Sequence, residues 1–291
     1  MPSPNLEPQR AAAAPADADA NAEATPVGDR LVFLGGLHRS GTTPLARWLA
    51  AHPEVSGLSA TGAFEDEGQH LQSVYPIAAA HGGPGRFTLD PAARLTETSP
   101  LLTPDAAQLL LDAWMPFWDT SKAALVEKSP PNLIRMRFLR ALFPQARFVM
   151  VVRHPVAVAL ATRKWRRFTM SALIRYWLAG HRHLVEDARQ VGRVAVIRYE
   201  DLMSAPDQEL DRVFAFLSLA PHREDWPVRT GINDAYFSQY RPARRPLRRW
   251  LHTRAAREYE QQVAPFGYSL LEPSRLEPPA PEIAALRPPP R

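Results

Sequence analysis

A glycine-rich segment, GGLHRSGTT, carries the residues best suited to hold an anion. Gly36 and Gly41 have the G-x-x-x-x-G spacing of a phosphate-binding loop, in which backbone amides and a helix N-terminus bind the oxyanion. Thr42 stands where the nucleotide-hydrolase version has lysine, and the cation comes earlier, at Arg39. A guanidinium and nearby hydroxyls can grip a tetrahedral oxyanion without magnesium. The candidate anion-binding residues are Arg39, Ser40, Gly41, Thr42 and Thr43.

Two further cations stand at the ends of apolar runs. Lys128 is one of only three lysines, against 32 arginines, and it either acts on a phosphate oxygen or is a surface lysine paired with Glu127. Arg153 ends the run FVMVV, where nucleotide hydrolases carry a magnesium-binding aspartate. The arginine excess suits an anionic ligand, although a general compositional bias gives the same count. The net charge of +5 does not distinguish an anionic ligand from a compositional bias.

The elements that must position these residues alternate along the chain. Apolar runs at residues 31–34, 124–126, 148–152 and 194–197 predict buried strands, each followed by a loop and a helical pattern. The helical patterns lie at residues 42–52, 132–143, 156–165 and 207–217. This alternation predicts a P-loop-like, three-layer α/β fold with a central parallel sheet flanked by helices. In such sheets ligands bind at the carboxyl ends of the strands, where the candidate residues fall.

Composition bounds the class of protein. The 291 residues are 45% hydrophobic and 22% charged, which is typical of a globular domain. Because the chain has no cysteine, disulfides, thiolate metal sites and a cysteine nucleophile are excluded. No apolar run approaches the roughly 20 residues of a membrane helix and no signal-peptide pattern is present, so we expect a cytoplasmic protein without a membrane span. We expect one domain at 29–271, between an N-terminal tail at 1–28 and a Pro-rich tail at 272–291.

Three blocks of the sequence resemble one enzyme family. The run RSGTTPLARWLAAHPEV at 39–55 resembles the 5′-phosphosulfate loop of sulfotransferases that use 3′-phosphoadenosine-5′-phosphosulfate (PAPS). Residues 127–155 are similar to the second block of that family, and VIRYEDL at 196–202 to the third. The resemblance is strongest to the branch of tyrosylprotein and many bacterial sulfotransferases, and it covers residues 32–219.

The resemblance implies a role for each donor-binding residue. The segment 39–43 would bind the bridging phosphate and the sulfuryl group, and Arg153 the 3′-phosphate. The family has a serine eight residues after this arginine, where this chain has Ala161, so Thr162 is the candidate substitute. Tyr199 would lie near the adenine, or is an ordinary half-buried tyrosine. Arg163 and Lys164 either add charge at the 3′-phosphate or are solvated. No metal is implied.

The resemblance also implies a base and a catalytic cation. Lys128 matches the lysine that stabilises charge on the leaving phosphate, and a glutamate shortly after the HPEV turn removes the acceptor's proton. Glu65 is the first candidate for this base, with Glu67 and His70 as alternatives. Alternatively, the acidic residues at this position, Glu65 and Glu67 among them, only form a charge cluster at a helix N-terminus, where the helix dipole favours negative charge.

The sequence therefore predicts a sulfotransferase that acts on a hydroxyl acceptor, which can be a small molecule, a saccharide or a protein tyrosine. The alternatives are a P-loop nucleotide kinase, against which the missing lysine argues, and a catalytically inactive nucleotide-binding relative, which Ala161 suggests. A nucleic-acid partner is not expected, because the arginine cluster at 241–257 lacks a recognised binding motif. That cluster is either a cationic flap over the site or a solvated face. The acceptor and the oligomeric state stay open.

Overall fold

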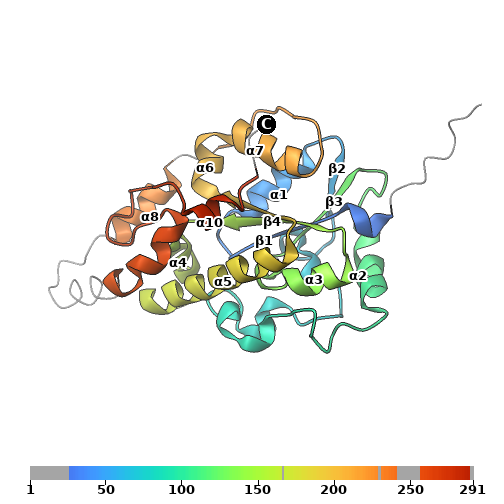
Figure 1. Cartoon of the computed structure of the whole chain (residues 1–291), viewed down its shortest axis with the longest axis horizontal. Helices are drawn as coiled ribbons and strands as arrows, with labels where there is room; N and C mark the ends of the chain where they lie inside the picture. Colours follow the sequence, from blue (N-terminus) through green and yellow to red (C-terminus); the bar gives the residue numbers. More distant parts are fainter. Residues whose placement is uncertain (1–25, 166, 229–230, 241–255, 289–291) are drawn as a thin grey trace, which may run out of the picture.

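The computed structural model describes residues 26–288, except residues 166, 229–230 and 241–255. Its centre is a sheet of five parallel strands in the order β2-β3-β1-β4-β5 (Figure 1). The strands are β1 (Leu31–Gly36), β2 (Val55–Gly57), β3 (Ala124–Lys128), β4 (Arg147–Val152) and β5 (Val194–Arg198). The predicted parallel sheet is confirmed. All five carboxyl ends point to one edge, which is where parallel α/β sheets bind their ligands.

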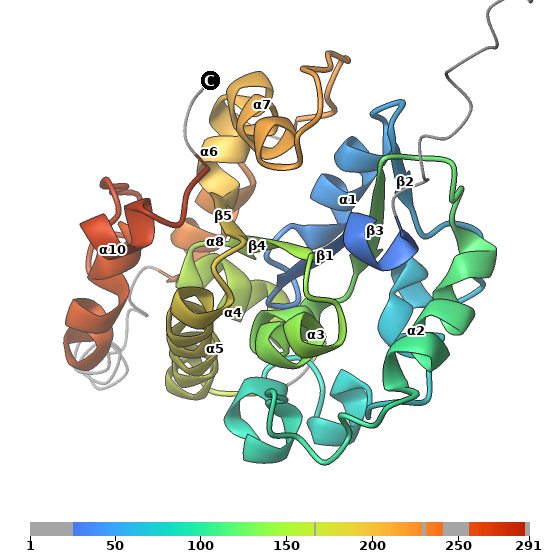
Figure 2. The same ribbon diagram turned by 45° about the vertical axis from the view of Figure 1, so that its right-hand side comes forward.

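The main helices cover both faces of this sheet. They are α1 (Thr42–Ala50), α2 (Ala106–Trp114), α3 (Met136–Leu142), α4 (Pro155–Arg163), α5 (Met170–Val191), α6 (Tyr199–Ser204), α7 (Pro206–Phe216), α8 (Ile232–Tyr240) and α10 (Pro281–Ala284). Figures 1 and 2 show α1, α6 and α7 on one face and α3 and α5 on the other. The fold is therefore the three-layer arrangement that the sequence predicts.

Alternate strand residues supply the two hydrophobic cores. Phe33 and Phe148 point to the face that carries α3 and α5, whereas Val32 and Val149 point to the face that carries α1 and α7. Successive side chains of a strand point to opposite faces, so apolar residues at every position bury both faces at once. This burial explains why the strands read as continuous apolar runs in the sequence.

The strand predictions are confirmed, with one omission. The four predicted strands form β1, β3, β4 and β5, each extended by one or two residues. The short edge strand β2 was not predicted. Of the predicted helices, the one at 132–143 is divided: a 3-10 helix covers Pro130–Ile134, and α3 begins only at Met136.

The chain's described ends differ from the expected tails. Residues 27–30 form a 3-10 helix, and the expected tail at 272–291 contains α10. Ile283 is buried in the core, and the Leu286 carbonyl accepts a hydrogen bond from the Val196 N–H of β5 at 2.8 Å. Residues 1–25 lie outside the described part of the chain, as does most of the arginine cluster at 241–257.

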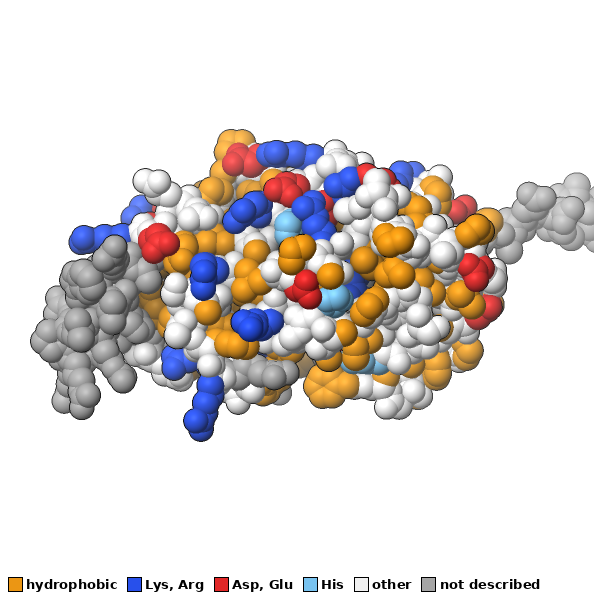
Figure 3. All heavy atoms as spheres, turned by 90° about the horizontal axis from the view of Figure 1, so that it is seen from below, with side chains coloured by type: hydrophobic (Ala, Val, Ile, Leu, Met, Phe, Trp, Pro, Cys, Tyr) orange, Lys and Arg blue, Asp and Glu red, His pale blue; other side chains and the backbone are white. Residues whose placement is uncertain are grey.

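The charges of the described surface are mixed. On the face in Figure 3, Lys and Arg side chains are interspersed with acidic and apolar ones rather than gathered into one patch. Among the residues that the structure describes, no helix is both long and apolar enough to cross a membrane.

Candidate active site

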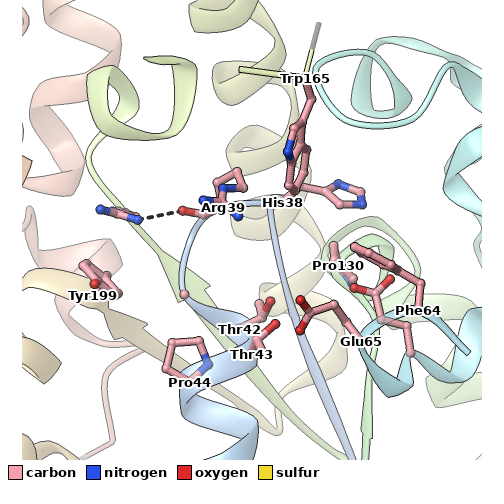
Figure 4. Close-up of a pocket in the computed structure, with 13 residues that line it drawn as sticks. His38, Arg39, Thr42, Thr43, Pro44, Phe64, Glu65, Pro130, Trp165 and Tyr199 are labelled. Carbon is pink, nitrogen blue, oxygen red and sulfur yellow. Dashed lines mark hydrogen bonds between the residues drawn. The ribbon is translucent and has the colours of Figure 1, made fainter. Parts of the chain in front are cut away.

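A cavity of about 200 Å³ opens at the carboxyl ends of the strands, lined by residues that follow β1, β3, β4 and β5 (Figure 4). A second cavity of about 540 Å³ adjoins it, and Thr43 and Glu65 line both. The predicted candidates that line the first cavity are Arg39, Gly41, Thr42, Thr43, Glu65, Glu67, Arg153 and Tyr199. Lys128 lines the second. The structure thus brings most of the candidates into one region, whereas Ser40, His70 and Thr162 line neither cavity.

The loop between β1 and α1 turns sharply enough to aim backbone amides at the cavity. Gly41 has φ 104°, and a Cβ there would lie 2.4 Å from the Tyr199 ring, so glycine is required. No side chain caps the first turn of α1, which leaves its amides available to an anion. The Ser40 hydroxyl instead donates to the Leu37 carbonyl at 2.6 Å and closes the loop.

Arg153 is held rigidly behind this loop. Its Nη1 donates to the Arg39 carbonyl at 2.9 Å (dashed in Figure 4), and its Nε and Nη2 donate to the Asn233 Oδ1 at 3.1 and 2.7 Å. Its guanidinium lies 4.2 Å from the centre of the Tyr199 ring. Burial lowers the pKa of Arg153, yet an arginine stays charged in proteins. The described residues engage three of its five N–H groups, so two can bind a ligand.

The helix after Arg153 does not present a hydroxyl to the cavity. Thr162 is fully buried in α4, and its Oγ1 has no partner among the described residues. Ala161 packs against Ala157 and Tyr236 of α8. The Tyr236 hydroxyl lies 3.3 Å from Lys164 Nζ. The described contacts therefore bring the hydroxyl of Tyr236, rather than that of Thr162, beside a cation.

Lys128 and Glu67 form a buried ion pair at the cavity. Their side chains are about 6% exposed, and Lys128 Nζ lies 3.3 Å from Glu67 Oε1. Lys128 also donates to the Glu65 carbonyl at 2.7 Å. The Glu65 side chain itself is 38% exposed, and its nearest ion-pair partner is Arg47 at 4.0 Å. His70 lies 3.7 Å from Glu67. The surface-lysine alternative is wrong, because Lys128 is buried and pairs with Glu67.

Five lining residues were not among the predicted candidates, namely His38, Pro44, Phe64, Pro130 and Trp165. His38 packs edge-on against Phe87, and burial, with the nearby Lys128 charge, lowers the pKa of His38 to about 3, so it is neutral at pH 7. Phe64 and Trp165 are 65% and 48% exposed, and Trp165 packs over the Arg39 guanidinium at 4.7 Å. The sequence gives a signal only for His38, which directly precedes RSGTT. The aromatic residues come from distant segments.

No group of three or more His, Asp or Glu side chains within the described ranges is placed to hold a metal ion. The described lining residues supply electrostatic and acid–base chemistry: anion binding by amides and guanidinium groups, a buried ammonium, and two carboxylates.

Comparisons with known proteins agree with this geometry. A model of the sulfotransferase family matches residues 32–225. The chain is 26% identical over 224 residues to nodulation protein NoeE of Sinorhizobium fredii (strain NBRC 101917 / NGR234), covering 66% of this chain and 50% of that protein. It is 25% identical over 203 residues to protein-tyrosine sulfotransferase 2 of Gallus gallus, covering 65% and 51%. The chain therefore spans about half the length of these two relatives.

A solved structure supports the fold. The sulfotransferase domain from the Synechococcus PCC 7002 olefin synthase superposes with a TM-score of 0.51 at 21% identity, covering 82% of this chain and 94% of that domain.

Proposed function

This chain belongs to the sulfotransferase family, and from that premise we propose that it transfers a sulfuryl group from PAPS to a hydroxyl acceptor. The observation that carries the proposal is one arrangement: an uncapped helix start with Arg39, a buried Lys128 and a free carboxylate converge at the strand ends. The reaction needs these three parts, because one holds the phosphosulfate, one stabilises the leaving phosphate and one removes a proton.

The start of α1 fits the phosphosulfate end of the donor. The uncapped amides and the positive end of the helix dipole favour an anion, and Arg39, Thr42 and Thr43 line the same cavity (Figure 4). The donor supplies an activated sulfuryl group, and these residues would hold it in place. Ser40 would act indirectly, since its hydroxyl shapes the loop.

The surroundings of Arg153 fit a second phosphate, which PAPS carries at its 3′ position. The Arg153 guanidinium lies 5.8 Å from the centre of the Tyr236 ring, and Lys164 Nζ lies 3.3 Å from the Tyr236 hydroxyl. We assign the 3′-phosphate to these three residues, with Tyr236 supplying the hydroxyl that Ala161 lacks. Thr162 is fully buried and has no such cation beside its hydroxyl among the described contacts, so we do not assign it to the 3′-phosphate.

Glu65 is the proposed base, and Lys128 the cation at the leaving oxygen. Glu65 lines both cavities, its side chain is 38% exposed, and its ion-pair partner Arg47 lies 4.0 Å away, so it can accept the acceptor's proton as the oxygen attacks sulfur. Glu67 already accepts hydrogen bonds from Lys128 and Gln69. It remains the alternative base because it lines the same cavity. His70 does not line it.

The acceptor is proposed to carry a flat ring beside its hydroxyl. Among the described residues, the large exposed apolar side chains include two aromatic ones, Phe64 and Trp165, and both line this cavity. Aromatic rings favour stacked and edge-on packing against one another. A phenol, including a protein tyrosine, meets this description, whereas faster transfer to aliphatic alcohols than to phenols would contradict it.

The donor site is tested by thermal unfolding. We expect adenosine 3′,5′-bisphosphate to raise the melting temperature, because a ligand that binds the native state stabilises it. ATP with magnesium should raise it much less. An equal or larger shift with ATP would support a kinase instead. Measurable transfer of labelled sulfate from PAPS to a phenol then separates an enzyme from an inactive nucleotide-binding relative.

A further inference from the structure

Glu127 is a buried carboxylate without a role in the reaction as described above. It lies on β3 directly before Lys128, is 0% exposed, and lines neither cavity. Its Oε1 accepts a hydrogen bond from the Ser129 hydroxyl at 2.5 Å, and its Oε2 accepts one from the Asn132 side-chain amide at 2.5 Å. Burying a charged group costs free energy unless its hydrogen bonds are satisfied, and here both carboxyl oxygens accept one.

Hydrogen bonds connect this carboxylate to the cavity. Ser129 Oγ, which donates to Glu127, accepts the backbone N–H of Gln69 at 2.9 Å. The Gln69 side-chain amide donates to Glu67 Oε2 at 2.6 Å, and its Oε1 accepts the Ala78 N–H, which fixes the amide's orientation. Glu67 Oε1 in turn lies 3.3 Å from Lys128 Nζ. The route runs from Glu127 through Ser129, then through the backbone and side chain of Gln69, to the ion pair at the cavity.

Packing fixes the same segment against Glu127. A Cβ on Gly68 would lie 2.5 Å from Glu127 Oε1, so the backbone between Glu67 and Gln69 rests directly on the carboxylate. The Trp114 indole N–H donates to the Gly68 carbonyl at 3.0 Å from the other side. The segment that carries Glu67 is therefore held between a strand carboxylate and a helix side chain.

The charges that face Glu127 come from three segments. Glu67 lies in the loop before α2, Lys128 follows on β3, and Tyr75 and Arg135 pack behind. Burial raises the pKa of Glu127 to about 7, against which its hydrogen bonds with Ser129 and Asn132 act. Both of these groups donate, so the two carboxyl oxygens of Glu127 serve as acceptors.

We propose that Glu127 is a positioning residue of the transfer reaction: through Ser129 and Gln69 it fixes the carboxylate of Glu67, and thereby aims the ammonium of Lys128 into the site. The inference rests on the proposed function, since it concerns the cation of that reaction. A misplacement of about 1 Å can reduce turnover about a hundredfold.

Two variants cut the route at different points. Glu127→Gln keeps the size of the side chain and removes its charge, and Ser129→Ala removes only the hydroxyl between Glu127 and Gln69. We expect both to lower kcat for phenol sulfation about 10- to 100-fold. The affinity for adenosine 3′,5′-bisphosphate, measured by calorimetry, should stay within about threefold of wild type, because Arg39 and Arg153 lie outside the route.

A readout independent of turnover uses the low lysine content. With lysine labelled by ¹³C at Cε, the protein has three signals, from Lys122, Lys128 and Lys164, which Lys→Arg variants assign. We expect the Lys128 signal to shift in both variants while the other two stay in place. This readout needs no donor or acceptor, so it tests the inference even if the wild-type protein proves to transfer no sulfate.

The matched control is Asp187→Asn. Asp187 is also 0% exposed, but its partner is Arg94 at 2.6 Å and it has no contact with the route. Its variant should lose stability yet keep kcat and the Lys128 signal. An unchanged kcat and Lys128 signal in a folded Glu127→Gln would overturn the proposal. If Glu127→Gln does not fold, an unchanged kcat and an unchanged Lys128 signal in Ser129→Ala would overturn the proposal. A loss of kcat in Asp187→Asn as large as in the two route variants would also overturn it.

Discussion

In the proposed reaction Lys128 and Glu65 act on opposite sides of the transferred sulfuryl group, although the Lys128 ammonium donates to the Glu65 backbone carbonyl. Lys128→Ala should lower turnover about a hundred- to a thousandfold for every acceptor, because it removes a cation from the leaving phosphate. The measurement is kcat across phenols of graded pKa. A Lys128→Ala defect that disappears with acidic phenols would contradict this role.

Glu65→Gln should behave differently across the same phenols. It removes a base worth about a hundred- to ten-thousandfold, and acidic phenols such as nitrophenols need that base least. The defect should therefore shrink as the acceptor's pKa falls, while the affinity for adenosine 3′,5′-bisphosphate survives. Glu67→Gln is the comparison, since Glu67 lines the same cavity. If the dependence on acceptor pKa appears in Glu67→Gln instead, the base is Glu67.

Individual residues were predictable where a motif fixes the backbone. Arg39, Gly41, Thr42 and Thr43 and the strand-end cations Lys128 and Arg153 line the two cavities at the strand ends, where the sequence places the site, whereas Ser40 lines neither. Phe64 and Trp165 could not be found in this way, because their place depends on how distant segments pack. Whether a hydroxyl faces a cavity also depends on helix rotation, which spacing alone does not give, and Thr162 illustrates this.

At the scale of elements, α8 rather than α4 should complete the 3′-phosphate site. Tyr236→Phe removes the hydroxyl beside Lys164, so it should weaken adenosine 3′,5′-bisphosphate binding about 5- to 30-fold, whereas adenosine 5′-monophosphate binding should barely change. Arg153→Ala should likewise weaken the binding of adenosine 3′,5′-bisphosphate more than that of adenosine 5′-monophosphate. Thr162→Val is the matched control and should affect neither nucleotide. Calorimetry with both ligands measures this.

The opposite result has a clear meaning. If Thr162→Val loses the preference for the 3′-phosphate and Tyr236→Phe keeps it, then α4 rotates on binding and supplies the hydroxyl itself.

The differences between the predicted and the observed elements have local physical causes. The strand β2 has three residues, too few for a recognisable run, and forms because β3 offers it a partner. The helix expected from Asn132 starts late because Pro130 and Pro131 begin a 3-10 helix, and the Asn132 side chain bonds to the Leu34 carbonyl. Arg135 then points inward, with its Nη2 donating to the Pro76 carbonyl. Hydrogen bonds to other strands and loops outweigh local helix periodicity here.

For the molecule as a whole, buried titratable groups set the dependence of stability on pH. Burial lowers the pKa values of His38 and His154 to about 3 and that of His181 to about 4, from an ordinary 6.5. Below pH 6.5 the unfolded chain therefore binds protons that the folded protein excludes, and stability falls by about 1.4 kcal/mol per pH unit for each histidine. Glu127 has the opposite effect on stability. Because its pKa is raised to about 7, the folded protein binds a proton there that the unfolded chain does not bind down to about pH 4.5. The raised pKa of Asp187 acts in the same direction as that of Glu127.

The free energy of unfolding should therefore fall between pH 6.5 and 4.5 by roughly 2 to 3 kcal/mol per pH unit, because the three histidines outweigh Glu127 and Asp187. In Glu127→Gln the compensating proton is missing, so the slope should be steeper by about 1.4 kcal/mol per pH unit. Urea denaturation at several pH values measures both slopes. A steeper decline in the wild-type protein than in the variant would contradict the assignment of these groups.

The hydrogen bond between Val196 and Leu286 also bears on how the protein is made. The strand β5 ends the sheet, and an uncovered edge strand is a template for pairing with other chains. Residues 281–287, which cover it, leave the ribosome some 85 residues after β5, roughly 5 to 20 seconds later at usual rates of synthesis. During that interval the nascent chain has all five strands of the sheet but this edge open, so self-association on crowded polysomes is the hazard that this late segment removes.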